Sequence, residues 1–289
     1  MDTSQIQVPL VVIVGETASG KSALGLELAK RFHGEIICAD SRTIYKGMDI
    51  GTAKPSLEER AMVPHHLLDV VEPGQPFTAA DFKVLANQSI TDIAARGKLP
   101  IMVGGSGLYI DSVLFDFEFG AVGNPAQRAQ LEALSIEKLQ SMVLEQGVPM
   151  PENRMNKRYL VRALERGKIE PKKAPLRNNT LVLGLAPERP VLNQRIQERV
   201  DAMIATGLEA EARGLAGRYG WETEAMKGVG YQEFKQALQD ETVRERIIQN
   251  TRKLAKRQRT WFKRNPSVQY VTNLSQAVEL VTTFLSKNQ

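Results

Sequence analysis

The chain has 289 residues, the length of one large or two modest domains, and 42% of them are hydrophobic, enough for a packed core. It contains no run of about 18 apolar residues, no basic region before its first apolar stretch and a single cysteine, Cys38. We therefore expect no membrane span, no signal peptide and no internal disulfide, as in a cytoplasmic protein. The formal net charge is a modest +5.

The first half of the chain alternates apolar runs with helical patterns. Apolar runs lie at residues 8–14, 35–39 and 99–103, and each is followed by Gly or Asp. A helical pattern covers residues 21–32, and a second one runs to about residue 96 from Thr78-x-x-Asp81, which has the form of a capping box. Strands without polar alternation, separated by helices, predict a parallel sheet buried on both faces.

The pattern changes after Leu114. Residues 115–177 lack strand-like runs and contain three helical stretches, at 125–134, 136–146 and 152–166. A fourth apolar run at 181–185 is expected to rejoin the sheet, and helices are expected at 191–206 and 243–262. The sequence thus predicts a core made of residues 1–114 and 178–289, and a helical insertion at 115–177.

The basic residues are concentrated in the second half. Between residues 244 and 264 there are nine Lys and Arg against one acid, and between 150 and 175 there are eight against three. Such a distribution is typical of a protein with an anionic partner, although a solvated helix face has the same composition.

One motif carries most of the chemical information. Residues Gly15-Glu16-Thr17-Ala18-Ser19-Gly20-Lys21-Ser22 match the pattern G-x-x-x-x-G-K-[ST] between a predicted strand and a predicted helix. In such a loop the glycines let the backbone approach an anion, the N–H groups at the helix start point at phosphate oxygens, and the lysine adds a cation. The hydroxyl of Ser22 is placed to contact Mg²⁺. We therefore predict an α/β fold of the P-loop NTPase type that binds a diphosphate or triphosphate, with a glycine-rich turn without ligand as the alternative.

Further motifs follow the P-loop in order along nearly the whole chain. They lie at residues 40–55, 64–69, 79–82, 103–109, 162–165, 228–231 and 251–258. Together with residues 15–22 they resemble the tRNA dimethylallyltransferase family of bacterial type, and residues 40–55 are the most specific of them. The resemblance implies an enzyme that transfers a dimethylallyl group from its diphosphate to N6 of adenosine 37 in tRNA, next to the anticodon, and releases diphosphate. It also implies Mg²⁺ as cofactor, and we expect a monomer.

The resemblance implies roles for individual residues. Asp40 would be the general base, Lys21 would face the leaving group, and Ser106, where the family usually has threonine, would contact the adenosine or the diphosphate. The P-loop residues Gly15, Glu16, Thr17, Ala18, Ser19, Gly20, Lys21 and Ser22 would hold the diphosphate, with Ser22 on the metal. The tRNA would contact Asp40, Ser41, Arg42, Thr43, Ser106, Arg128, Lys157, Arg158, Arg162, Lys227, Tyr231 and Gln232.

Three positions depart from the family pattern. Glu16 replaces a proline and places an acid beside the anion site, so its side chain is expected to point away. Ser106 keeps the hydroxyl of threonine, and Tyr159 stands where arginine is frequent. No cysteine pair follows the last predicted helix, so we do not expect the zinc finger of eukaryotic members.

The implied reaction needs a strong electrophile, because the N6 amine of adenine is a poor nucleophile. The P-loop, Lys21 and magnesium would neutralise the departing diphosphate, and Asp40 would accept the amine proton. Residues 36–40 also resemble a Walker B strand, in which Asp40 would assist magnesium instead; the continuation to residue 55 favours the base.

The target adenosine must be turned out of its stack in the anticodon loop. Aromatic side chains could stack on it, and the candidates, each of which could equally be a core residue, are Tyr45, Phe77, Tyr109 and Tyr231. His65 and His66 lack further metal-ligating partners, so we interpret them as structural.

Three other functions are open. A small-molecule P-loop kinase would turn over ATP, but it leaves the basic C-terminal helix unexplained. A prenyltransferase for free adenine nucleotides would share the P-loop but should lack a tRNA-binding insertion. A non-catalytic RNA-binding module would not need a complete P-loop.

Overall fold

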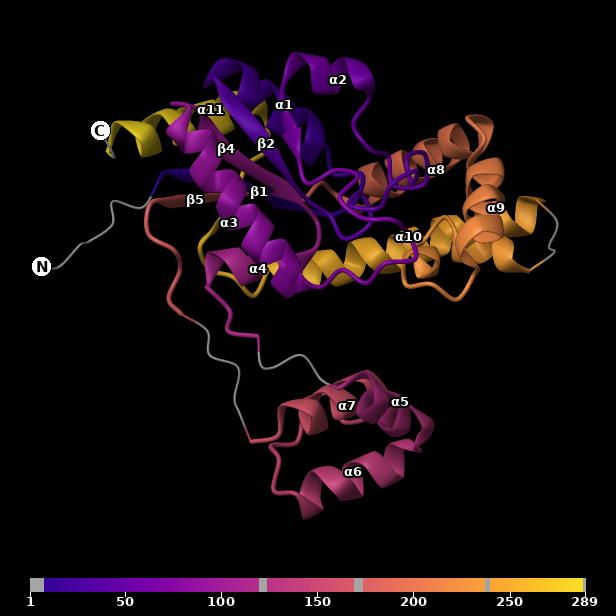
Figure 1. Ribbon diagram of the computed structural model, residues 1–289. Coiled ribbons are helices and arrows are strands. Elements are labelled where there is room, and N and C mark those ends of the chain that lie inside the picture. Colours follow the sequence, from indigo (N-terminus) through magenta and orange to yellow (C-terminus); the bar gives the residue numbers. More distant parts are fainter. Residues whose placement is uncertain (1–7, 120–123, 169–173, 237–239, 288–289) are drawn as a thin grey trace, which may run out of the picture. The chain divides into compact units, whose positions relative to one another are not determined.

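The computed structural model describes residues 8–119, 124–168, 174–236 and 240–287. The chain divides into two compact units, a core unit made of Met1–Leu114 and Leu176–Gln289 and an insertion unit, Phe115–Pro175 (Figure 1). The second boundary lies two residues before the one that the sequence predicts. Among the described helices, none combines the length and apolar character that a membrane span requires.

The core unit contains a six-stranded sheet in which every neighbouring pair is parallel, so the predicted α/β class is confirmed. The strand order is β3-β2-β4-β1-β5-β6. The strands are β1 (Leu10–Gly15), β2 (Gly34–Ala39), β3 (His65–His66), β4 (Leu99–Gly104), β5 (Thr180–Leu185) and β6 (Val268–Tyr270). The sequence pattern does not predict β3 and β6, because two and three residues are too short to show periodicity.

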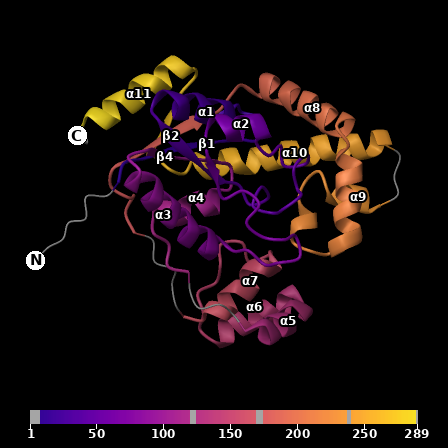
Figure 2. The ribbon, with the colours of Figure 1, turned by 45° about the horizontal axis from the view of Figure 1, so that its top comes forward.

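Helices cover both faces of the sheet, as Figures 1 and 2 show. One face carries α1 (Lys21–Arg31) and α11 (Leu274–Ser286), and the other carries α3 (Ala79–Ala95), α4 (Gly107–Leu114) and part of α10 (Asp240–Phe262). Every residue of β1, β2 and β4 is consequently buried. Burying each large aliphatic side chain contributes about 1.5–3 kcal/mol, which explains why these strands are continuous apolar runs.

The remaining helices of the core unit extend it beyond the sheet. They are α2 (Leu57–Met62), α8 (Arg189–Ala205) and α9 (Leu208–Tyr219), with two 3₁₀ turns, η1 (Ala225–Lys227) and η2 (Gln232–Lys235). A second apolar cluster joins α8, α9 and α10 to the loop after β2 through residues such as Ile44, Met48, Ile196, Leu215 and Ile247. This cluster fixes the loop that borders the P-loop.

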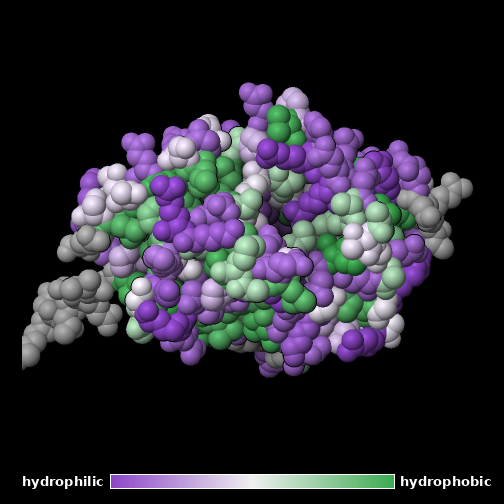
Figure 3. All heavy atoms as spheres, turned by 90° about the horizontal axis from the view of Figure 1, so that it is seen from above, coloured by the Kyte–Doolittle hydropathy of each residue, from purple (hydrophilic) through white to green (hydrophobic). Residues whose placement is uncertain are grey.

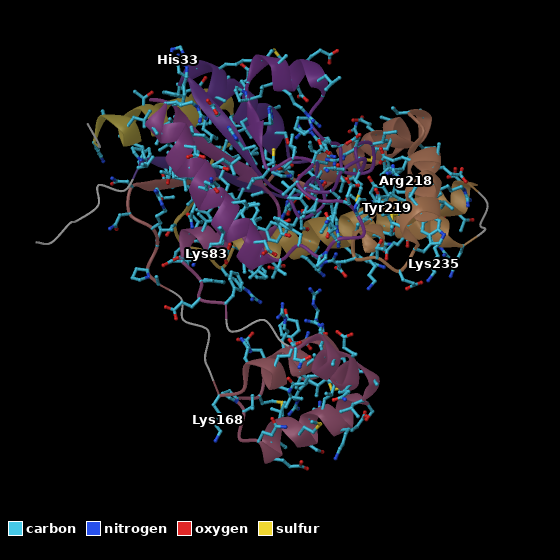
Figure 4. All side chains as sticks on the ribbon, viewed as in Figure 1. His33, Lys83, Lys168, Arg218, Tyr219 and Lys235 are labelled. Carbon is cyan, nitrogen blue, oxygen red and sulfur yellow. The ribbon has the colours of Figure 1, made fainter. Side chains whose placement is uncertain are left out.

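Local signals explain several helix ends. Thr78 accepts a hydrogen bond from the Asp81 N–H, and the Asp81 carboxylate accepts one from the Thr78 N–H, so the predicted capping box forms. At the end of α9, the Tyr219 hydroxyl donates to Glu72 at 2.6 Å and the Arg218 guanidinium lies 5.1 Å from the Tyr219 ring centre (Figure 4). The hydrogen bond to Glu72 holds the segment after β3 against α9.

The insertion unit is a small helical body with its own core. Its helices are α5 (Pro125–Ala133), α6 (Ile136–Glu145) and α7 (Lys157–Arg166). Leu131, Leu139, Val143, Leu160 and Leu164 form the centre of its apolar cluster. Helix α7 begins five residues later than the pattern predicts, because the side chain of Asn156 caps it by accepting from the Arg158 N–H.

Candidate active site

The P-loop lies where β1 ends and α1 begins. Gly20, just before α1, has a φ of 95°, which a residue with a Cβ rarely adopts, and a Cβ at Gly15 would lie 2.8 Å from the Leu185 carbonyl oxygen. The two glycines therefore allow the backbone to form a tight turn. The first N–H groups of α1 point out of the end of the helix and have no intrahelical partners. Such an arrangement binds anions.

Ser19 supplies an independent sign of a ligand. Its side chain is 5% exposed, and its hydroxyl has no hydrogen-bond partner among the described residues. Buried hydroxyls are nearly always satisfied, so an unpaired one in a phosphate loop fits contact with a bound oxyanion.

Lys21 is held beside this loop. Its Nζ donates a hydrogen bond to the Glu16 carbonyl oxygen at 3.1 Å. Burial and the nearby Arg199 lower the pKa of Lys21 to about 8, while Asp40 and Glu16 act in the opposite direction. A buried cation is strongly stabilised when an anion binds beside it, because the anion replaces the favourable interaction with solvent that burial removes.

Two arginines of α8 complete the positive side of the site, and the sequence analysis missed them. Arg195 donates to the Ser19 carbonyl oxygen at 3.4 Å, and Arg199 donates to the Thr52 carbonyl oxygen at 3.2 Å. Both line the recess next to Lys21 and Ser22. Their spacing of four residues, beside the buried stripe of α8, is a signal that sequence alone contains, but it does not say which loop the helix faces.

The pocket itself has a volume of about 580 Å³, part of it open to solvent, and its lining includes Thr17, Lys21 and Ser22 of the P-loop together with Asp40 and Thr43. Figure 3, a view onto the side that carries α1 and α2, shows a hollow in the surface that is bordered by both hydrophilic and weakly hydrophobic residues. Three of the eight predicted diphosphate residues, Thr17, Lys21 and Ser22, thus share one pocket with the predicted base, Asp40. Cys38 also lines it, but burial raises the pKa of this thiol to about 12, so it is no nucleophile.

Asp40 follows the last residue of β2, at the edge of the sheet where α/β proteins bind their ligands. Its Oδ1 accepts a hydrogen bond from the Arg42 N–H at 2.9 Å, while its Oδ2 has no partner among the described residues. One oxygen is therefore used to orient the carboxylate, and the other is available to a ligand. This geometry suits a general base, and it equally suits a carboxylate that assists a metal.

Ser106 joins Asp40 to the neighbouring strand. Its Oγ accepts a hydrogen bond from the Ser41 N–H at 2.8 Å, and its own N–H donates to the Ala39 carbonyl oxygen at 3.2 Å. The hydroxyl proton stays free to donate to a substrate. Ser106 consequently positions the turn that carries Asp40, and the threonine methyl that it lacks is not needed for this contact.

The donor set fits magnesium only as a companion of the diphosphate. Among the described residues, no group of three His, Cys, Asp or Glu side chains could hold a metal ion. His65 instead contacts the Val63 carbonyl oxygen at 2.7 Å, and His66 contacts Glu35 at 2.6 Å, as structural histidines do. Magnesium commonly takes one or two protein oxygens together with substrate phosphates and water, and the Ser22 hydroxyl is in place for that.

The segment 40–55 forms a wall of the pocket, and a buried lysine holds it together. Lys54, whose side chain is 1% exposed, pairs with Asp49 and Asp69, each at 2.6 Å, and donates to the Tyr45 carbonyl oxygen at 2.9 Å. The specificity of this stretch of sequence therefore has a structural basis.

The prediction that Tyr231 contacts tRNA is wrong for its side chain. Tyr231 is fully buried, and its hydroxyl donates at 2.7 Å to Glu211, which also accepts from the N–H groups of residues 49–51. Tyr45 and Tyr109 are buried as well, so none of these three rings can stack on a base. Phe77, which is half-buried and lies 6.2 Å from the Tyr109 ring, is the exception among the four aromatic candidates.

The other predicted tRNA residues occupy varied places. Arg42 of the loop after β2 contacts Glu224, which also pairs with Lys227 at 3.7 Å, so two of the predicted segments meet in the core unit. Gln232, beside them, is exposed. In the insertion unit, Arg128 pairs with Glu132 at 2.8 Å and with Glu165 at 3.4 Å, while Lys157, Arg158 and Arg162 belong to α7.

Glu16 does not line the pocket. Its carboxylate pairs with Arg259 of α10, away from the anion site, as the sequence analysis expects of a side chain at this position. Arg259 is thereby engaged inside the core unit rather than displayed on the surface of α10.

Comparison with known proteins gives one consistent family. A family model described as IPP transferase matches residues 43–265. The tRNA dimethylallyltransferase of Geobacillus thermodenitrificans is 44% identical over 282 residues, which cover 90% of this chain and 89% of that protein. The protein of the same name from Streptococcus equi subsp. equi is 41% identical over 273 residues, which cover 90% of each chain.

Solved structures agree with the sequence comparison. The full-length tRNA isopentenylpyrophosphate transferase of Bacillus halodurans superposes with a TM-score of 0.75 at 35% identity, over 98% of this chain and 97% of that one. A eukaryotic dimethylallyltransferase, whose structures show it acting on tRNA, superposes with a TM-score of 0.80 at 28% identity, over 97% of this chain and 80% of that one.

Proposed function

The chain belongs to the IPP transferase family, and we propose from that premise that it transfers a dimethylallyl group to N6 of adenosine 37 in tRNA, next to the anticodon. The donor in this proposal is dimethylallyl diphosphate, and diphosphate is released. One observation carries the proposal: a single pocket is lined by Lys21 of the P-loop, by Arg199 and by Asp40. The pocket can hold a leaving diphosphate and a proton acceptor together.

Departure of the diphosphate is the step that the positive side of the pocket assists. As the C–O bond of the allylic diphosphate lengthens, negative charge grows on the diphosphate oxygens. Gly20, Lys21, Ser22, Arg195 and Arg199 line the recess at the start of α1, so their N–H groups and cationic side chains are near this charge and stabilise it. Magnesium, when bound, supplies further positive charge, and Ser22 is the residue that would hold it.

Removal of the proton is the step that Asp40 performs. N6 gains positive charge as its bond to the allylic carbon forms, and it must lose a proton. The unpaired Oδ2 of Asp40 accepts it, while Oδ1 stays bound to the Arg42 N–H and keeps the carboxylate oriented. Ser106 holds the turn on which this geometry depends.

The tRNA itself is held by exposed cations in this proposal. Lys253, Lys256 and Arg257 lie exposed on α10, and Arg158 and Arg162 lie exposed on α7. Phosphate contacts of this kind position the nucleic acid without reading its sequence. We expect the chain to do this as a monomer in the cytoplasm, where tRNA is modified.

The direct test is product formation. The chain, magnesium and labelled dimethylallyl diphosphate are incubated with unmodified tRNA, and the nucleosides are then separated. We expect N6-dimethylallyladenosine in the tRNA and none in parallel samples that contain AMP or ATP. Label in AMP or ATP alone would favour a prenyltransferase of free nucleotides, and phosphate release from ATP without label transfer would favour a kinase.

The exposed cations of α10 lead to a separate prediction about salt. Binding of tRNA to the wild-type chain should weaken steeply as salt rises, and each of the changes Lys253→Gln, Lys256→Gln and Arg257→Gln should reduce the slope of log K against log salt by about 0.7–0.9 for a lost phosphate contact. The measurement is tRNA binding by filter retention at several salt concentrations. Lys30→Gln, a change of equal charge on α1, should leave the slope unaltered. Equal slopes in all variants would mean that the α10 cations only solvate the helix.

A further inference from the structure

Two consecutive residues of α10, Gln258 and Arg259, form hydrogen bonds with two consecutive residues of the P-loop, Thr17 and Glu16. The Thr17 N–H donates to Gln258 Oε1 at 2.7 Å, and Gln258 Nε2 donates in turn to the Gly105 carbonyl oxygen at 3.1 Å. Next to it, Arg259 donates from Nη2 to Glu16 Oε2 at 3.0 Å and from Nε to Glu16 Oε1. The same Nη2 donates to the Pro187 carbonyl oxygen at 2.7 Å, after β5. These contacts join the beginning and the end of the chain.

The pair between Glu16 and Arg259 is a built contact rather than a chance surface pair. Glu16 is 2% exposed and the Arg259 side chain is 21% exposed. A forked guanidinium–carboxylate contact fixes direction as well as distance, which a single point charge cannot do. A buried ion pair contributes little net stability, since desolvation offsets its attraction, but removal of one partner leaves the other charge unpaired in the interior. The pair therefore acts mainly by holding residue 16 in place.

Residue 16 in turn holds the chemical groups of the P-loop. Its carbonyl oxygen accepts the hydrogen bond from Lys21 Nζ at 3.1 Å and another from the Ser19 N–H at 3.2 Å. The side chain of Glu16 is thus tied to α10, while its backbone is tied to the ammonium and to the turn that face the diphosphate. Unlike proline, glutamate has no ring that restricts φ. The conformation of residue 16 therefore depends on a contact with another part of the fold, here Arg259.

We propose that Glu16 and Arg259 are positioning residues of the diphosphate site. The pair, supported by Gln258, keeps the Glu16 carbonyl oxygen and the N–H groups of the P-loop in the geometry that receives the diphosphate, and it acts through Lys21 without touching the substrate. The inference rests on the proposed function only in that the ligand is a diphosphate. Preorganised donors lose about 10²-fold in effectiveness when they are displaced by about 1 Å, so release of this tie should be measurable.

The test is the binding of inorganic pyrophosphate with magnesium, measured by calorimetry at a temperature well below unfolding. Glu16→Gln and Arg259→Gln should each weaken binding by about 10- to 100-fold. The double variant should lose no more pyrophosphate affinity than the single variant that binds more weakly, because both residues act through one contact. Arg259→Lys keeps the charge but loses the fork, so it should fall between wild type and Arg259→Gln. Arg244→Gln is the matched control, because it breaks a forked pair with Asp201 that is also made by α10 but lies far along the helix from the P-loop.

A merely structural role would give a different pattern. The melting temperature would fall in the variants, yet the folded protein would bind pyrophosphate with wild-type affinity, and that result would overturn the proposal. In turnover assays we expect the KM for the prenyl diphosphate to rise while the KM for tRNA stays the same. If Glu16→Gln does not fold, the pyrophosphate affinities of Arg259→Lys and Arg259→Gln test the proposal: it requires tighter binding by Arg259→Lys, and wild-type affinity in both would overturn it. Since inorganic pyrophosphate carries no prenyl group, a failure of tRNA modification in the wild type would contradict the proposed function and leave this comparison intact.

Discussion

Asp40→Asn should reduce the rate of prenyl transfer by about 10²–10⁴-fold, the usual contribution of a positioned proton acceptor. Asparagine keeps the size of the side chain and can still accept the hydrogen bond from the Arg42 N–H, so the turn after β2 should persist. What it loses is basicity at Oδ2, the oxygen that has no partner among the described residues. Single-turnover rates with saturating tRNA measure this loss directly.

The same variant distinguishes the two roles that the pocket allows Asp40. As a base, Asp40 contacts the adenine amine, so binding of a non-reactive dimethylallyl diphosphate analogue with magnesium should remain near normal. As a partner of magnesium, it belongs to the diphosphate site, and the analogue should bind about as poorly as it does to Lys21→Ala. Calorimetry on both variants separates these outcomes, and a parallel loss of analogue affinity would show that our assignment of the base is wrong.

Lys21→Ala should lower kcat/KM for dimethylallyl diphosphate by about 10²–10³-fold, the range found when one charge-stabilising group is removed from an active site. In contrast to Asp40→Asn, it should also weaken analogue binding, because the ammonium faces the diphosphate both in the ground state and in the transition state. Steady-state kinetics and calorimetry on the same preparation test both parts. Normal analogue affinity in Lys21→Ala would place the diphosphate elsewhere in the pocket.

The lowered pKa of Lys21 adds a pH dependence with a definite sign. Below about pH 8 the free enzyme carries the ammonium, and above it the neutral amine predominates, so kcat/KM for the diphosphate should fall as the pH rises through about 8. Lys21→Arg keeps its charge throughout this range and should show no such fall, although its absolute activity will be lower. A fall of equal size in both enzymes would assign the titration to another group.

Several features follow from local sequence and needed no tertiary information. The P-loop is recognisable because its glycines and lysine all lie within residues 15–21, and the capping box at Thr78 and Asp81 spans a single turn. The buried strands show as continuous apolar runs because each is covered on both faces. Asp40 could be placed at the sheet edge because it directly follows such a run.

Features that depend on which surfaces meet could not be predicted in this way. Tyr231 is an aromatic residue next to a lysine-containing segment, which is typical of a side chain that stacks on a base. In the structure, however, its hydroxyl donates a hydrogen bond to Glu211, twenty residues earlier, and the ring is buried in the core. Lys54 and Asp69 are charged residues in two different loops, and only the folded chain shows that the buried Lys54 pairs with the partly exposed Asp69. Local patterns give the face of a helix or the end of a strand, but not its neighbour.

The sequence by itself determined the P-loop, the parallel α/β core, the family and the pairing of a phosphate site with Asp40, because each rests on residues close together in the chain or on a whole-chain resemblance. The tertiary structure alone decided that Arg195 and Arg199 face the P-loop and that Arg259 holds Glu16 across 243 residues of sequence. The physical reason is that an arginine on a helix has the same local signature whether it meets solvent, tRNA or a buried carboxylate. Only the packing of α10 against β1 and α8, and the contact of α8 with the P-loop, determine which of these it contacts.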